Sequence, residues 1–167
     1  MSALDALIER ATRPAAVAAL LLAASAGALG TAFVAQYWGG LDPCPLCLYQ
    51  RVPFAVGGVL AIAALAVSSG ARGRLLALIG LGFAVNAAIA VYHVGVENHW
   101  WASAVCGGNV PAIASAEDLR RALAQPGPKP CDTVDWTLFG VSMAGYNIVF
   151  SSALAVLAFA GWARTRR

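Results

Sequence analysis

Four cysteines are the residues of this 167-residue chain whose types and spacing point most directly to chemistry. Cys44 and Cys47 form a Cys-x-x-Cys pair, whereas Cys106 and Cys131 stand apart from each other further along the chain. A Cys-x-x-Cys pair holds two sulfurs within bonding distance, and a thiol of lowered pKa serves there as both nucleophile and leaving group. The pair therefore suggests electron exchange through a disulfide.

The residues just before the pair are typical of a helix start. Asp42 is a suitable N-cap, and Pro43 is a suitable first helical residue. Cys44 and Cys47 would then lie in the first helical turn, where the helix dipole favours a thiolate.

Two other uses of the cysteines are weighed against redox chemistry. One Cys-x-x-Cys plus two separated cysteines is unlike the paired ligands of a zinc ribbon, so no metal site is predicted. A Cys106–Cys131 disulfide could also serve as a structural link that stabilises a loop by a few kcal/mol. The glycines and prolines that flank both residues indicate mobile segments, which a structural link seldom joins.

The composition indicates what kind of structure must hold these cysteines. Apolar residues make up 60% of the chain and charged residues 11%, whereas soluble domains are about 25% charged. This leaves too little polar surface for a soluble globule and too much apolar surface for a disordered chain. The net charge of +3 comes with no basic run dense enough for nucleic acid. A polytopic protein of the lipid bilayer is therefore predicted.

We expect an all-α fold, a single membrane domain over residues 1–167 with four transmembrane helices. Each helix needs about 20 apolar residues, and the runs found cover about 15–36, 48–67, 75–94 and 138–162. Two loops, about 37–47 and 95–137, would lie on one side, the longer one with a short amphipathic helix over 112–125. Ala24-Ser25-Ala26 resembles a signal-peptide cleavage site, but the apolar run continues beyond it, which favours a span.

The basic residues predict the orientation in the membrane. Seven of the eleven Lys and Arg residues lie at the two termini or between the second and third predicted helices. An even number of spans puts these segments on one side, which the positive-inside rule makes cytoplasmic. All four cysteines then lie on the opposite side, two in each loop. In a bacterium this is the oxidising periplasm, beyond the inner membrane.

The second span reaches full length only if it extends toward the cysteine pair. Val52–Val67 alone would make about 24 Å of helix against a core of about 30 Å. Extension through Leu48 places Cys47 at the membrane interface, with Arg51 one turn away on the same face. The pair could there reach a lipid-soluble electron carrier. Arg51 could steady a Cys47 thiolate or donate to a quinone carbonyl, or simply extend toward the headgroups.

Other polar residues near the spans have open interpretations. His93, near the end of the third helix, could share a pocket with Arg51 and donate to a quinone oxygen, or could form an interhelical hydrogen bond. Asn86 and Asn147 lie mid-span, where interhelical hydrogen bonds are expected. Pro53 either kinks the second helix or marks the start of its regular part.

Several of these segments resemble one known family. Residues 43–51, Pro-Cys-Pro-Leu-Cys-Leu-Tyr-Gln-Arg, resemble the redox motif of the disulfide bond formation protein B (DsbB) family. Residues 92–97, Tyr-His-Val-Gly-Val-Glu ahead of Cys106, and residues 140–142 with Asn147 are also similar to its members. Together with the four-helix topology, the resemblance covers most of the chain.

The resemblance implies a quinone-dependent thiol oxidase in a bacterial inner membrane. Its members reoxidise DsbA, a periplasmic dithiol oxidase of the thioredoxin fold, and pass the electrons to a membrane quinone, ubiquinone or menaquinone. Because DsbA is itself a strong oxidant, a quinone is a suitable acceptor for its electrons. By position, Arg51 and His93 match the quinone site of the family.

The resemblance also implies a role for each cysteine. Cys106 would be the sulfur attacked by the thiolate of the partner protein, and Cys131 would be its loop partner. Cys44 would exchange with this second pair, and Cys47 would be the thiolate that faces the quinone. Two alternatives are kept: an enzyme like vitamin K epoxide reductase, and a membrane protein without enzymatic activity whose disulfides are structural.

Overall fold

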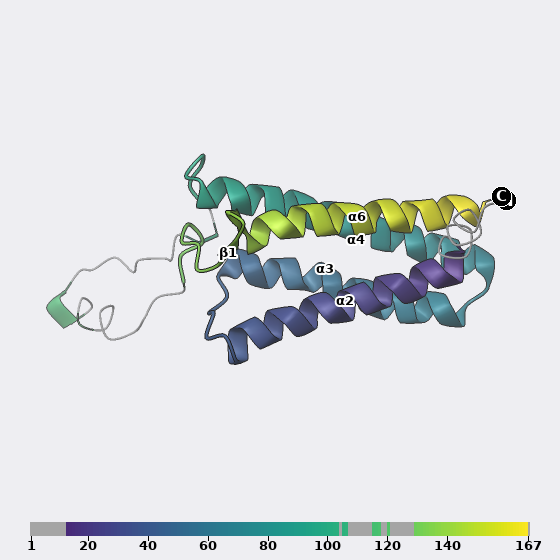
Figure 1. Cartoon of the computed structure of the whole chain (residues 1–167), viewed down its shortest axis with the longest axis horizontal. Helices are drawn as coiled ribbons and strands as arrows, with labels where there is room; N and C mark the ends of the chain where they lie inside the picture. Colours follow the sequence, from purple (N-terminus) through teal and green to yellow (C-terminus); the bar gives the residue numbers. More distant parts are fainter. Residues whose placement is uncertain (1–12, 104, 107–114, 118–119, 121–128, 167) are drawn as a thin grey trace.

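Four long helices form an elongated bundle (Figure 1). The computed structural model describes residues 13–103, 105–106, 115–117, 120 and 129–166. The helices in this part of the chain are α2 (Pro14–Tyr37), α3 (Pro45–Ala66), α4 (Ser69–Glu97) and α6 (Met143–Arg164). All four are long and apolar enough to cross a membrane, which confirms the predicted all-α, four-helix membrane fold. The amphipathic helix predicted over 112–125 falls mostly outside the described residues.

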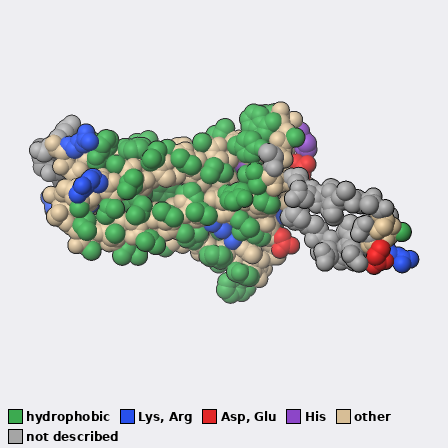
Figure 2. All heavy atoms as spheres, turned by 180° about the vertical axis from the view of Figure 1, so that it is seen from behind, with side chains coloured by type: hydrophobic (Ala, Val, Ile, Leu, Met, Phe, Trp, Pro, Cys, Tyr) green, Lys and Arg blue, Asp and Glu red, His purple; other side chains and the backbone are tan. Residues whose placement is uncertain are grey.

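Hydrophobic side chains cover the sides of the bundle (Figure 2). Large apolar residues such as Val59 and Val149 are 66% and 70% exposed, as expected where lipid rather than water surrounds the helices. The interior is a narrow core to which the helices contribute Leu21, Phe54, Phe83 and other buried residues. Small residues allow this close packing, because a Cβ at Gly57 would lie 3.1 Å from the Phe83 ring.

The start of α3 differs from the sequence-based expectation, and the difference affects the cysteine pair. The N-cap is Cys44 rather than Asp42, and Pro45 takes the first helical position, where no N–H is needed. The Cys44 backbone is extended, and its Sγ accepts a hydrogen bond from the Cys47 N–H at 3.3 Å. The helix runs through Pro53 without interruption, so the suggestion that regular helix begins at this residue was wrong.

The start of α6 also differs, because a short hairpin precedes it. Strands β1 (Thr137–Leu138) and β2 (Val141–Ser142) pair antiparallel, so the predicted fourth helix begins at 143 rather than 138. Phe139 and Gly140 between the strands have φ values of 51° and 77°, the left-handed backbone of a tight hairpin turn. The Ser142 hydroxyl then accepts from the N–H of Gly145 at 3.1 Å and caps α6.

The opposite end of the bundle is closed by a short turn between α3 and α4. The helix α4 begins at Ser69, earlier than the predicted residue 75, and ends at Glu97 instead of 94. Arg72 donates from Nε to the Ala64 carbonyl at 2.7 Å and from Nη2 to the Val67 carbonyl at 2.9 Å. These bonds satisfy carbonyl groups at the end of α3 that have no partner within the helix.

Candidate active site

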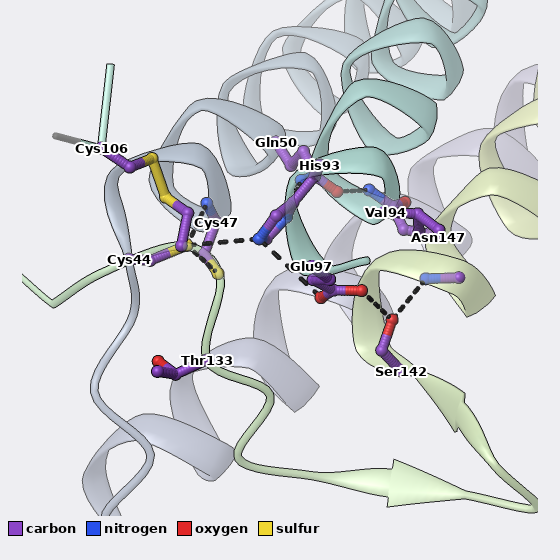
Figure 3. A network of polar contacts seen from close by, with 12 residues as sticks. Cys44, Cys47, Gln50, His93, Val94, Glu97, Cys106, Thr133, Ser142 and Asn147 are labelled. Atoms are coloured by element: carbon purple, nitrogen blue, oxygen red, sulfur yellow. Dashed lines mark hydrogen bonds and ion pairs between the residues drawn. A yellow bond between two sulfur atoms is a disulfide. The ribbon is translucent and has the colours of Figure 1, made fainter. Parts of the chain in front are cut away.

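The four cysteines, distant in sequence, lie in one cluster where α3 begins and α4 ends (Figure 3). Cys106 and Cys131 form a disulfide with a Cα–Cα distance of 5.6 Å, and both are buried. Cys44 and Cys47 are thiols whose sulfurs lie 2.8 Å apart in a hydrogen bond. Cys44 is buried, whereas Cys47 is partly exposed. The two cysteine pairs therefore pack together, one oxidised and one reduced.

The position of Cys106 depends on how the chain leaves α4. The Trp101 ring packs directly on Gly95, where a Cβ would overlap the ring. This ring stacks on Tyr92 at 5.9 Å between centroids, and its Nε1 donates to the Tyr92 carbonyl at 3.1 Å. Beyond it, the Ser103 hydroxyl accepts from the N–H of Cys106 at 3.0 Å. Together these contacts turn the chain back toward the start of α3.

The segment that carries Cys131 has local contacts of its own. Lys129 and Asp135 form an ion pair, and the Thr133 hydroxyl donates to the Pro130 carbonyl at 3.2 Å. His99 Nε2 lies 3.8 Å from a carboxylate oxygen of Asp132, which joins this segment to the chain after α4. The Cys106–Cys131 bond thus links two segments that also touch through side chains.

The environment of Cys44 stabilises a thiolate. The pKa of the Cys44 thiol is lowered to about 4, chiefly by the hydrogen bond with the Cys47 side chain. Burial opposes this shift, while hydrogen bonds with His93 and with the Cys47 N–H support it. The N-cap position adds to the effect, because the helix N-terminus favours a negative charge. In the reduced pair the negative charge is therefore on Cys44, which differs from the resemblance, where the thiolate is expected at Cys47.

His93 is the polar side chain that links Cys44 to the interior of the bundle (Figure 3). Its Nε2 lies 3.6 Å from the Cys44 sulfur and 3.8 Å from a Glu97 carboxylate oxygen. Its Nδ1 lies 2.8 Å from Nε2 of Gln50. The other oxygen of Glu97 accepts from the Ser142 hydroxyl at 2.6 Å, which ties the end of α4 to the start of α6.

Arg51 has different partners from those suggested by its spacing from Cys47. The guanidinium donates from Nη1 to Gln36 at 2.6 Å and from Nη2 to the Ala32 carbonyl at 3.4 Å. It also lies over the Phe33 ring, 5.2 Å from the centroid. Its described contacts are thus with α2, because α3 turns this side chain toward its neighbour in the bundle. Among the described residues, these hydrogen-bond and ring contacts of Arg51 do not include Cys47.

A cavity of about 510 Å³ opens beside the reduced cysteine pair. Cys44, Cys47, Arg51 and His93 all line it, so these four predicted site residues share one space. Most of the remaining lining is apolar and comes from α2, α3 and α6. Such a mainly apolar cavity with a few polar groups is typical of a small-molecule site.

The pair and His93 also form a possible metal-ligand group. Sulfur and nitrogen atoms of Cys44, Cys47 and His93 all lie within 4.8 Å of one another. Two thiolates and an imidazole are ligands that zinc accepts. The same two sulfurs cannot bind a metal once they join in a disulfide, so metal binding and redox exchange would compete at this site.

Several contributors were not identified from the sequence as site residues. Glu97 follows His93 by four positions on one helix, a spacing that places both on the same face and could have suggested the contact. Gln50 was noted only as part of the motif, and Ser142 only as part of the resemblance. Their contacts cross between helices, and no local spacing predicts such contacts. Hydrogen bonds of Asn86 and Asn147 between helices, which the sequence did predict, are confirmed.

Comparisons with known proteins agree on one family. The family model described as "Disulfide bond formation protein DsbB" matches residues 14–161. A protein of Acidovorax sp. strain JS42 named disulfide bond formation protein B is 32% identical over 87% of this chain and 86% of its own length. Its namesake from Xylella fastidiosa strain 9a5c is 36% identical over 78% of this chain and 79% of its own length. No solved structure matches the chain.

Proposed function

This chain belongs to the disulfide bond formation protein B (DsbB) family, a family of membrane disulfide oxidoreductases, and on that premise we propose its electron path. Electrons enter from a periplasmic DsbA-like oxidase of the thioredoxin fold, pass through both cysteine pairs and leave to ubiquinone or menaquinone. The observation that carries this proposal is the packing of the Cys106–Cys131 disulfide against the Cys44–Cys47 thiols, beside a mainly apolar cavity.

The first exchange would occur at the outer pair, Cys106 and Cys131. A partner thiolate attacks the Cys106 sulfur, the Cys106–Cys131 bond breaks, and Cys131 leaves as a thiolate. The second thiol of the partner then breaks the mixed disulfide, which oxidises the partner and leaves two electrons in the outer pair. Cys106 suits this role because it lies beyond the end of α4, outside the four long helices.

The second exchange would move the electrons inward. The outer dithiol attacks a Cys44–Cys47 disulfide, which restores the Cys106–Cys131 bond and leaves the inner pair reduced. The arrangement in the structure corresponds to this last state, with an outer disulfide and inner thiols.

The residues around the cavity fit a quinone. Its volume of about 510 Å³ lies within the usual range for small-molecule sites, about 300–1,000 Å³. Apolar residues of α2 and α6 suit the ring and the isoprenoid tail of a quinone, and Arg51 offers N–H donors for its carbonyl oxygens. A bound quinone would accept two electrons and two protons. The protein holds Cys47, Arg51 and His93 at the wall of this cavity.

The proposed orientation puts the cysteine cluster in the periplasm and both termini in the cytoplasm of a bacterial cell. Most coloured Lys and Arg side chains gather at the end of the bundle away from the cysteines (Figure 2). The positive-inside rule assigns that end to the cytoplasm.

The test is the redox state of all four cysteines in native membranes, read as mass shifts after alkylation. With quinone present, we expect disulfides to be regenerated after each addition of a reduced thioredoxin-fold oxidase. With quinone depleted, both pairs should accumulate as thiols. Two disulfides that remain oxidised whether or not quinone is present would identify structural links and would exclude the electron path.

A further inference from the structure

A line of polar side chains, buried except for the partly exposed Asn147, crosses the bundle and ends at the cysteine pair; Figure 3 shows its part from Asn147 to Cys44. It begins at Asn86 on α4, whose Nδ2 donates to the Ser151 hydroxyl of α6 at 2.9 Å. Ser151 donates to Oδ1 of Asn147 at 2.8 Å, and Asn147 donates from Nδ2 to Oε1 of Gln50 on α3. Gln50 Nε2 lies 2.8 Å from Nδ1 of His93. The line thus joins three helices.

The line has a direction, because each member donates to the next. Ser151 has one hydroxyl proton, which goes to Asn147, so Asn147 presents its oxygen to Ser151 and its NH₂ to Gln50. Gln50 must then present its oxygen to Asn147 and its NH₂ to His93. An amide nitrogen only donates, so Nδ1 of His93 must be an acceptor without a proton. The proton of a neutral imidazole is then on Nε2.

The protonated nitrogen is the one that faces the cysteine pair. Nε2 lies 3.6 Å from the Cys44 sulfur, within reach of an N–H···S hydrogen bond. It also lies 3.8 Å from Glu97, whose other oxygen is occupied by the Ser142 hydroxyl. With the opposite tautomer, a nitrogen lone pair would face the thiolate and repel it.

We propose that the line of hydrogen bonds from Asn86 to Gln50 sets the tautomer of His93 and so makes this histidine the hydrogen-bond donor to the Cys44 thiolate. This inference deepens the proposed function and rests on it, because the Cys44 thiolate has a catalytic role only if the inner pair exchanges electrons. Gln50, Asn147 and Ser151 are positioning residues, because they act on the sulfur only through His93. Their burial supports the role, since Asn86 and Ser151 are fully buried and Gln50 is 6% exposed. These three buried groups cannot exchange their partners for water, and the partly exposed Asn147 is held between Ser151 and Gln50 by two hydrogen bonds.

The first test is the ¹⁵N NMR spectrum of the full chain, labelled at histidine, with the inner pair reduced and with neither quinone nor partner added. His93 and His99 are the histidines of the chain, and a His99→Gln variant assigns their signals. We expect His93 to be neutral with its proton on Nε2. A proton on Nδ1, or protons on both nitrogens, would overturn the inference.

The second test changes the donor in the middle of the line. Asn147→Asp keeps the shape of the side chain, but a carboxylate cannot donate to Gln50. The Gln50 amide should turn over and present its oxygen to His93, whose proton should move to Nδ1. The pH midpoint for iodoacetamide alkylation of Cys44 should then rise by about one unit, the order expected when a charged group loses one hydrogen bond.

The groups that could disturb this titration lie around the same cavity. Besides Cys44 and His93, the titratable side chains there are Asp42, Cys47, Arg51, Glu97, Tyr146 and the Lys129–Asp135 pair. The substitution replaces none of them, but it adds a carboxyl group, and a negative charge alone would also raise the midpoint. The ¹⁵N spectrum of Asn147→Asp separates the two causes, because a charge effect leaves the proton on Nε2 and would contradict the inference.

The matched control is Ser25→Ala, which changes a fully buried hydroxyl of α2 outside the line. It should leave both the His93 spectrum and the Cys44 midpoint unchanged. If Asn147→Asp does not fold, the spectrum of the unmodified chain still decides the question. Quinone reduction is measured separately. A His93 proton on Nε2 in a chain that reduces no quinone would support this inference and contradict the proposed electron path.

Discussion

The contact between Gly95 and Trp101 predicts that one methyl group will slow electron entry from the partner. In a Gly95→Ala variant, the new Cβ would overlap two carbons of the Trp101 ring and lie 2.6 Å from a third, Cη2. The α4 backbone is held by its helical hydrogen bonds, so the ring must move by roughly 1 Å or more to reach normal contact. Cys106 lies five residues after Trp101, so we expect a displaced ring to shift Cys106 as well.

The size of the effect follows from the contacts that the movement breaks. The Trp101 hydrogen bond to the Tyr92 carbonyl contributes about 1 kcal/mol, and the stacking of the two rings contributes about 0.5–1.5 kcal/mol. If these contacts no longer hold Cys106 in position, a loss of about 2 kcal/mol corresponds to a rate of electron entry that is lower by roughly ten- to hundredfold. The assay is single-turnover quinone reduction after mixing with a reduced thioredoxin-fold oxidase, followed by quinone absorbance.

The same helix supplies a matched control in Gly82, where an added Cβ would meet nothing within 4 Å. Gly82→Ala gains the usual helix preference of alanine, about 0.5–1 kcal/mol, without the clash. It should reduce quinone at the rate of the unmodified chain. A Gly95→Ala rate within twofold of that value, or an equal loss in Gly82→Ala, would refute the argument that Trp101 positions Cys106.

Four further predictions follow from the site and the helix ends. Cys47→Ser should abolish quinone reduction, because the remaining sulfur cannot form the inner disulfide; quinone-coupled turnover in this variant would contradict the role of Cys47. Arg51→Gln should raise the quinone KM by roughly tenfold or more through the loss of a charged donor, with exchange between the cysteine pairs unchanged. Cys44 should remain alkylatable down to about pH 4 and lose reactivity below it, because a lowered pKa keeps the thiolate at every pH above that value; a midpoint near 8 to 9 would exclude this. Arg72→Ala should lower the free energy of unfolding in denaturant by about 1–3 kcal/mol, because carbonyls at the end of α3 lose two hydrogen bonds. An unchanged unfolding midpoint would show that these bonds do not contribute to stability.

Helix boundaries show where sequence reasoning succeeded and where it did not. The first span was expected at 15–36 and is found at Pro14–Tyr37, because a continuous apolar run determines the extent of a membrane helix. The fourth span was expected from residue 138, but Phe139 and Gly140 adopt a left-handed turn that no helix includes. Apolar content alone does not distinguish such a hairpin from the first turn of a helix.

The sequence by itself determined the class of fold and the set of reactive sulfurs. Composition and run length required helices in a bilayer, and the Cys-x-x-Cys spacing required two neighbouring thiols, because both properties depend only on residues close together in the chain. The tertiary structure decided that Arg51 contacts α2, that His93 faces Cys44, and that Gln50 joins His93 to α6. These contacts depend on how each helix is rotated about its own axis, and that rotation is set by the packing of the whole bundle rather than by any local pattern.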